Sequence, residues 1–262
     1  MDGGEGVAGG VVLPAENGVV AFARERLGIE PDAKQCAFLA SEAKEGILNC
    51  SRQWGKSTMA AVKAVHRAMT RPGSLVVVAS PTEAQSAEMV MKARGMCRDM
   101  NVRVKGDGTG RPSVVLKNGS RILGLPGKEA STRGPSSVSM LILDEASRME
   151  DSLYLALLPT LAVGEGELWL LSTPCGRRGF FYEAWALGGE EWERHWVPAT
   201  ECPRISAAFL EKQRRKMPPQ WFQQEFMGEF VDNGTEVFDR GLVEAAFRED
   251  VADLGVGVRY GF

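Results

Sequence analysis

The chain has 262 residues, 44% hydrophobic and 25% charged, with a formal net charge of −3. This composition is typical of a globular protein, and the length suits one large domain or one domain with a small appendage. No apolar run approaches the roughly 20 residues of a membrane helix, and the glycine-rich, acidic N-terminus is unlike a secretory signal. The five cysteines form no C-x-x-C pair and histidines are few, so we expect no zinc site and a protein that works in the reducing interior of a cell. The net charge disfavours extensive coating of nucleic acid, although a local basic patch can still bind DNA phosphates.

Apolar and helical patterns alternate along most of the chain. Residues 1–17 are expected to be a flexible leader, because they begin glycine-rich and without hydrophobic periodicity. Alternation of strands and helices is typical of a parallel sheet with helices on both faces, so the predicted fold class is α/β. The predicted strands are Gly46–Cys50, Leu75–Ser80, Met140–Leu143 and Leu168–Ser172, and the predicted helices are Gly18–Leu27, Lys56–Thr70 and Thr82–Met96.

A hairpin is expected between the second and third of these strands. The segments Ser113–Lys117 and Ser120–Leu125 flank Asn118-Gly119, and an Asn-Gly pair favours a two-residue hairpin turn. We therefore predict an antiparallel ribbon added to the parallel sheet.

Strand patterns fade after about Pro198, and charged helical patterns replace them. They predict a small helical lid or linker over residues 201–262, following a core at residues 18–200. The helical patterns are Ser206–Lys216, Pro219–Met227 and Arg240–Phe247.

The segment Cys50–Thr58 follows a predicted strand and begins a predicted helix. It contains Gly-Lys-Ser, the ending of a Walker A loop, whose backbone N–H groups wrap phosphates at a helix N-terminus. In such a loop Lys56 would reach the β- and γ-phosphates of a nucleotide and the Ser57 hydroxyl would bind Mg²⁺, with Thr58 at best a substitute ligand. Cysteine replaces the first glycine of G-x-x-x-x-G-K-[ST], so an ordinary helix N-terminus explains the tripeptide equally well.

A second signal favours the nucleotide site. The apolar strand from Met140 ends in two adjacent carboxylates, Asp144 and Glu145. A Walker B strand needs this pair, because the first acid holds the Mg²⁺ shell and the second polarises the attacking water. Solvated acids at a strand end are common, but their position after a phosphate loop favours the functional interpretation.

The next apolar strand ends in hydroxyl groups, Ser172 and Thr173, followed by Pro174. In helicase-like ATPases such a strand lies beside the Walker B strand and senses the γ-phosphate. A GTPase is disfavoured because the sequence has no N-K-x-D guanine reader. Gln35, upstream of the loop, is similar to the glutamine with which helicase-like ATPases read adenine, although a helix surface residue explains it by itself.

Together these motifs resemble the ATPase domain of large terminases, the viral motors that pump double-stranded DNA into a capsid. The resemblance covers roughly residues 27–240 and implies a P-loop NTPase fold of the ASCE (RecA-like) type that uses ATP and Mg²⁺. The matching tail run is Gln224–Phe230, with Phe238 downstream, and the coupling strand is followed by Gly176, Gly179, Phe180 and Phe181. The unusual Walker A loop is matched by Ser51, Arg52, Gln53, Trp54, Gly55, Lys56 and Ser57, and the Walker B ending by Asp144, Glu145 and Ala146.

The resemblance gives roles to two arginines. It implies that Arg52 acts in cis on the γ-phosphate and that Arg133 is a finger acting in trans on a neighbouring subunit, where such a residue stabilises transition-state charge. A solvated loop arginine is an equal alternative for Arg133. For Arg177 and Arg178 a solvated turn is favoured over DNA contact.

The family also implies partners: double-stranded DNA, a portal protein, a small terminase subunit and a homo-oligomeric ring, a pentamer by resemblance. It places the motor in the cytoplasm of the bacterial host, docked transiently on the procapsid. Large terminases continue into a nuclease domain; this chain stops about where that domain would begin, so we expect no nuclease activity. The alternatives are another helicase-like ATPase stimulated by nucleic acid and a scaffold that binds ATP without hydrolysing it.

Overall fold

The computed structural model describes residues 18–126 and 136–231. Its seven strands form one sheet in the order β3-β4-β2-β5-β6-β1-β7. Every neighbouring pair is parallel except β3 and β4, which pair antiparallel. The predicted α/β fold with an added antiparallel ribbon is therefore confirmed. The strands are β1 (Glu45–Cys50), β2 (Leu75–Ser80), β3 (Ser113–Val115), β4 (Arg121–Pro126), β5 (Met140–Asp144), β6 (Glu167–Ser172) and β7 (Trp192–Val197).

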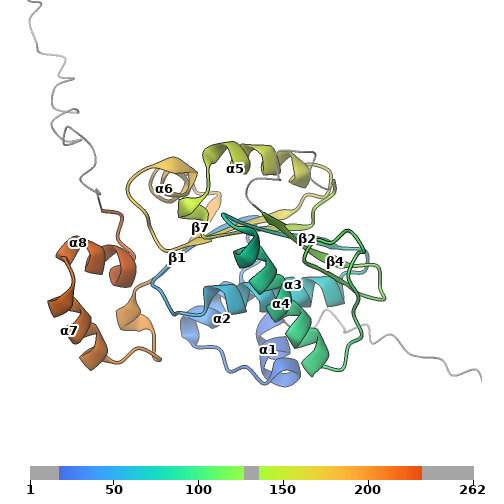
Figure 1. Cartoon of the computed structure of the whole chain (residues 1–262), viewed down its shortest axis with the longest axis horizontal. Coiled ribbons are helices and arrows are strands. Elements are labelled where there is room, and N and C mark those ends of the chain that lie inside the picture. Colours follow the sequence, from blue (N-terminus) through green and yellow to red (C-terminus); the bar gives the residue numbers. More distant parts are fainter. Residues whose placement is uncertain (1–17, 127–135, 232–262) are drawn as a thin grey trace, which may run out of the picture. The chain divides into compact units, whose positions relative to one another are not determined.

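Helices cover both faces of the sheet: α1 to α4 lie on one face and α5 and α6 on the other (Figure 1). Strand β2 shows the reason, because side chains alternate along a strand. Val76 and Val78 pack into the core layer beneath α3 and α4, whereas Val77 and Ala79 pack into the other layer. The helices are α1 (Val19–Leu27), α2 (Ala33–Ala40), α3 (Lys56–Thr70), α4 (Glu83–Asp99), α5 (Asp151–Leu157), α6 (Gly179–Ala186), α7 (Ala207–Lys216) and α8 (Pro219–Phe222).

Most predicted elements are confirmed to within a few residues, whereas β7, α2, α5 and α6 were not predicted. Strand β7 escaped prediction because it lies at the sheet edge, where its Glu193, Arg194 and His195 are not buried, so it has no apolar run. Helices α2, α5 and α6 are too short for a clear helical period.

The C-terminal helical pattern is confirmed in part. Pro219–Met227 divides into α8 and a π-helical turn, Gln223–Met227, and the predicted helix Arg240–Phe247 lies outside the described residues, as does the leader. Within the described ranges no helix is both long enough and apolar enough to span a membrane.

The strand order positions the site. Strand β6 lies between β1, which precedes the phosphate loop, and β5, which ends in the acidic pair. Because the three strands are parallel, their carboxyl ends meet at one edge of the sheet, where α/β proteins bind ligands.

Candidate active site

The segment after β1 has the geometry of a phosphate-binding loop. Gly55 immediately precedes α3 and has a φ of 97°, a left-handed conformation that glycine adopts without steric cost. Gln53 also has a positive φ, 65°, so the loop turns back sharply before the helix starts. A cavity of about 300 Å³ lies at this helix N-terminus, where N–H groups and the helix dipole favour an anion. It is lined by Ser51, Gln53, Trp54, Gly55, Lys56, Ser57, Thr58, Glu88 and Lys92.

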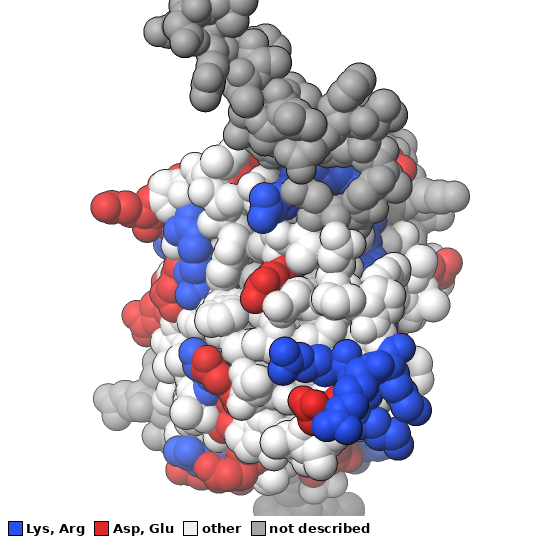
Figure 2. Space-filling model, turned by 90° about the vertical axis from the view of Figure 1, so that its left-hand side faces the viewer, with Lys and Arg blue, Asp and Glu red and all other residues white. Residues whose placement is uncertain are grey.

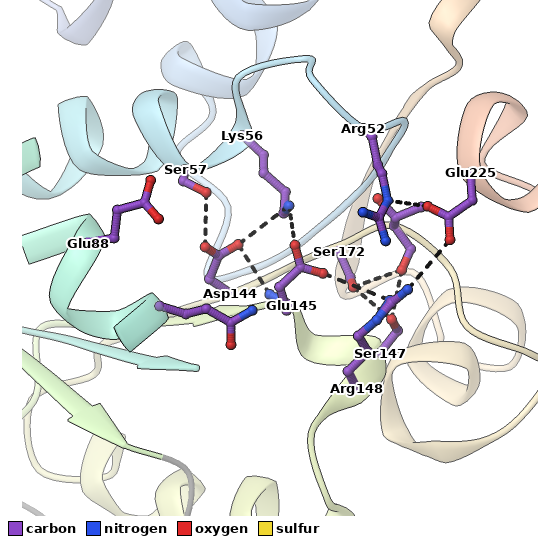
Figure 3. A network of polar contacts seen from close by, with 12 residues as sticks. Arg52, Lys56, Ser57, Glu88, Asp144, Glu145, Ser147, Arg148, Ser172 and Glu225 are labelled. Atoms are coloured by element: carbon purple, nitrogen blue, oxygen red, sulfur yellow. Dashed lines mark hydrogen bonds and ion pairs between the residues drawn. The ribbon is translucent and has the colours of Figure 1, made fainter. Parts of the chain in front are cut away.

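The loop and the acidic pair meet directly (Figure 3). Lys56 Nζ lies 2.5 Å from Glu145 Oε1, and Ser57 Oγ donates to Asp144 Oδ2 at 3.0 Å. Burial opposes the charge on Lys56, but the carboxylates of Asp144 and Glu145 outweigh it and raise the pKa of Lys56. The structure thus brings these four predicted site residues together.

The oxygens of Ser57 and Asp144 fit a magnesium ion. Mg²⁺ prefers hard oxygen ligands and is usually held by one or two protein groups together with phosphates and water. A hydroxyl and a carboxylate oxygen 3.0 Å apart beside the phosphate cavity supply two such ligands. In the described ranges no cluster of three or more acidic, His or Cys side chains is present, so a cage made only of protein ligands is not seen there.

Glu145 has a backbone conformation that is uncommon for a non-glycine residue. Its φ of 58° places it in the left-handed region, where strain is often retained at functional sites. The strand ends at Asp144, so the change of backbone direction turns the two neighbouring carboxylates to different sides: one toward Ser57 and the other toward Lys56. This separation lets one acid bind metal while the other approaches water.

The residues at the end of β6 contact the turn after β5. Ser147 Oγ lies 2.8 Å from Ser172 Oγ and donates to the carbonyl of Thr173 at 2.7 Å. Ser172 and Thr173 are buried. The predicted coupling residues therefore lie beside the acidic turn. Ser147 was not predicted, because no local motif marks it.

Arg52 pairs with Glu225, which belongs to the π-helical turn (Figure 3). Its backbone N–H also donates to the Glu225 carbonyl at 3.2 Å. Glu225 is 7% exposed, whereas 60% of the Arg52 side chain is exposed. The tail run thus packs onto the phosphate loop, a contact that the sequence prediction did not include.

Gln35 lies under the phosphate loop, with both ends of its amide engaged. Its Nε2 donates to the Trp54 carbonyl at 3.0 Å, and its Oε1 accepts from the backbone N–H of Asp32 at 3.0 Å. Arg204 donates to the same Trp54 carbonyl at 2.7 Å. Gln35 therefore supports the loop in this structure, and its predicted contact with adenine stays a prediction.

The remaining candidate arginines differ in placement. Arg177 donates to the carbonyl of Phe230, Arg178 is an exposed residue at the start of α6, and Arg133 lies outside the described residues. Two cavity residues were missed altogether, Glu88 and Lys92 on α4, which pair with each other at 2.9 Å. Only the folded sheet brings them to the loop.

Comparisons with known proteins find large terminase subunits as relatives of the chain. The chain is 28% identical over 254 residues to the large terminase subunit of Thermus phage G20c, covering 82% of this chain and 51% of that protein. It thus spans about half the length of the curated relatives it matches.

Two solved structures share the fold. The large terminase ATPase domain of Thermus phage P74-26 aligns with a TM-score of 0.70 and 25% identity, covering 79% of this chain and 97% of that one. The large terminase of another thermophilic bacteriophage, in complex with ADP, aligns with a TM-score of 0.62 and 16% identity, covering 81% and 52%. The family described as "Terminase large subunit, T4likevirus-type, N-terminal" matches residues 47–244. The chain therefore belongs to the terminase large-subunit family and corresponds to its N-terminal region.

Proposed function

We propose that this chain is the ATP-hydrolysing part of a motor that packages double-stranded DNA into a viral procapsid. The observation that carries the proposal is the set of contacts from the phosphate loop to the acidic pair, Lys56 to Glu145 and Ser57 to Asp144. Two neighbours support it, because one is an ATPase domain and another is a complex with ADP.

Each group has a defined role. Backbone N–H groups at the start of α3 and the Lys56 ammonium bind the phosphates. Ser57 and Asp144 would hold Mg²⁺, and the bound ion would supply positive charge to neutralise the phosphates. Without nucleotide, Lys56 neutralises Glu145. Phosphates draw Lys56 away, and the freed carboxylate then orients and polarises the attacking water.

The two arginines complete the site. Arg52 would stabilise γ-phosphate charge in cis after leaving Glu225, and Arg133 would do so in trans from a neighbouring subunit of a ring. Mixing tests the second role. Arg133→Ala and Glu145→Gln proteins, each inactive alone, should recover turnover when assembled together, because some interfaces then pair an intact Glu145 with an intact Arg133. If verified mixed assemblies recover no turnover, Arg133 does not act in trans.

A basic surface on α7 is consistent with DNA as the substrate. Lysine and arginine side chains gather on the face of the molecule where α7 lies (Figure 2). That helix carries one acidic residue, Glu211, and four basic residues: Lys212, Arg214, Arg215 and Lys216. Such a cluster binds DNA phosphates even in a chain whose net charge is −3.

The further partners follow from the family. We propose that the chain works with a portal protein and a small terminase subunit in the cytoplasm of the bacterial host, as part of a ring docked on the procapsid. The core at residues 18–200 and a lid or linker at residues 201–262 remain the proposed domain division.

A single-turnover ATPase assay with and without DNA tests the function. The motor function predicts turnover that duplex DNA stimulates. Stimulation by single strands alone would indicate a helicase-like ATPase, and tight ATP binding without turnover would indicate an assembly scaffold. Either result would overturn the proposal.

A further inference from the structure

Five side chains of alternating charge link the phosphate loop, the turn after β5 and the π-helical turn (Figure 3). Their order is Lys56, Glu145, Arg148, Glu225 and Arg52. The roles proposed above use the first two and the last. They leave Arg148, in the middle of the array, without a function.

Arg148 faces both acids. Its Nη1 lies 4.0 Å from Glu145 Oε2, and its Nη2 lies 3.5 Å from Glu225 Oε1. Its backbone is fixed as well, because its N–H donates to the Glu145 carbonyl at 2.9 Å in the turn after β5. About 31% of its side chain is exposed, so water screens the guanidinium only in part.

The two oxygens of Glu145 therefore face different cations. Lys56 pairs with Oε1 and Arg148 faces Oε2. When phosphates draw Lys56 away, Oε1 becomes free to accept a hydrogen bond from water. Of the described cations that pair with Glu145, Arg148 then remains beside the carboxylate. A catalytic base must keep its orientation, because a misplacement of about 1 Å can cost roughly a hundredfold in rate.

Glu225 prevents Arg148 from pairing with Glu145 alone. It is buried, and it shares its charge between Arg148 and Arg52, so the Arg148 guanidinium stays between two acids. Because Glu225 belongs to the C-terminal helical segment, a displacement of that segment would also change the contact of Arg148 with Glu145.

We propose that Arg148 is a positioning residue for ATP hydrolysis, whose positive charge holds Glu145 Oε2 so that Oε1 faces the attacking water. The proposal rests on the ATPase function proposed above. It assigns no contact between Arg148 and the nucleotide, so its loss should affect turnover and not ATP binding.

The test compares Arg148→Met, which keeps the length of the side chain without charge, with Arg148→Lys, which keeps the charge. We expect Arg148→Met to lower kcat by about 10- to 100-fold and to leave KM and the Kd of a fluorescent ATP analogue within about twofold. Arg148→Lys should recover part of the lost kcat. Arg98→Met is the control, because Arg98 is an exposed arginine on α4 that pairs with Asp99. It should behave like wild type.

The outcomes separate the two proposals. A wild-type protein without ATP turnover overturns the proposed function and this inference with it. With an active wild type, wild-type kcat in Arg148→Met, or equal losses in the Met and Lys variants, overturns the role of Arg148 alone. A thermal melt of each variant checks folding, and Arg148→Gln replaces Arg148→Met if the latter unfolds early.

Discussion

Lys63 joins two helices that build the phosphate site. It lies on α3, which begins at the phosphate loop, and its buried ammonium group donates to three carbonyls at the end of α2, the helix that carries Gln35. The acceptors are the carbonyls of Phe38, Leu39 and Ser41, at 3.2, 3.3 and 2.6 Å. Lys63 therefore satisfies the last turn of α2, where helix carbonyls lack partners within the helix.

We predict that Lys63→Met lowers the free energy of unfolding by about 2–6 kcal/mol. A hydrogen bond from a charged donor contributes about 1.5–3 kcal/mol, so three such bonds contribute roughly 5–9 kcal/mol. Burial opposes them: it lowers the pKa of Lys63 from 10.5 to about 8. That shift corresponds to about 3 kcal/mol against the buried cation at neutral pH, and methionine avoids this cost.

The pH dependence gives a sharper test. Between pH 8 and 10.5 the unfolded chain holds the Lys63 proton more tightly than the folded chain, so wild-type stability rises with pH in that window. The methionine variant lacks this contribution. Urea unfolding of both proteins, followed by tryptophan fluorescence, should give a stability difference about 1 kcal/mol larger at pH 9 than at pH 7. A difference that stays constant or narrows would refute the reasoning.

Three further predictions concern the support of the site. Arg67→Met should lower the free energy of unfolding by about 3–5 kcal/mol in chemical denaturation, because it leaves the buried Glu167 carboxylate without its cation. Adding Glu167→Leu should restore most of that stability. If the double variant is instead less stable than Arg67→Met alone, the ion pair does not account for the loss. Gly55→Ala should weaken binding of a fluorescent ATP analogue about tenfold, because a φ of 97° costs alanine about 1–2 kcal/mol; an unchanged Kd would contradict the loop geometry. Wild type should prefer ATP over GTP in kcat/KM and Gln35→Ala should lose that preference, whereas equal values in wild type would remove adenine recognition from Gln35.

The catalytic motifs could be predicted from sequence because their geometry is local. The phosphate loop needs a strand, a tight turn and a helix within a few residues, and the acidic pair needs only a strand end. Parallel strands then bring Lys56 and Glu145 together, although they are far apart in the chain. Order along the chain and strand direction were sufficient to predict one shared site, but not the direct contact between the two side chains.

The supporting contacts could not be predicted, because they depend on distances that only the fold sets. Glu225 reaches Arg52 from a different part of the chain, and Ser147 meets Ser172 across two strands. Arg204 holds the loop carbonyl of Trp54 from the segment before α7. Arg52, Ser172 and Glu225 each stand in a motif, but no motif specifies which side chains from distant segments meet, so the sequence did not predict these contacts.

The most direct test of the account separates binding from hydrolysis at the acidic pair. Nucleotide binding and single-turnover ATP hydrolysis are measured on wild type, Lys56→Ala and Glu145→Gln. We predict that Lys56→Ala loses tight binding, because the loop then lacks its phosphate cation, and that Glu145→Gln binds ATP normally while hydrolysis stops. Hydrolysis by Glu145→Gln at the wild-type rate would contradict the role of Glu145 as the residue that polarises water, and with it the central claim.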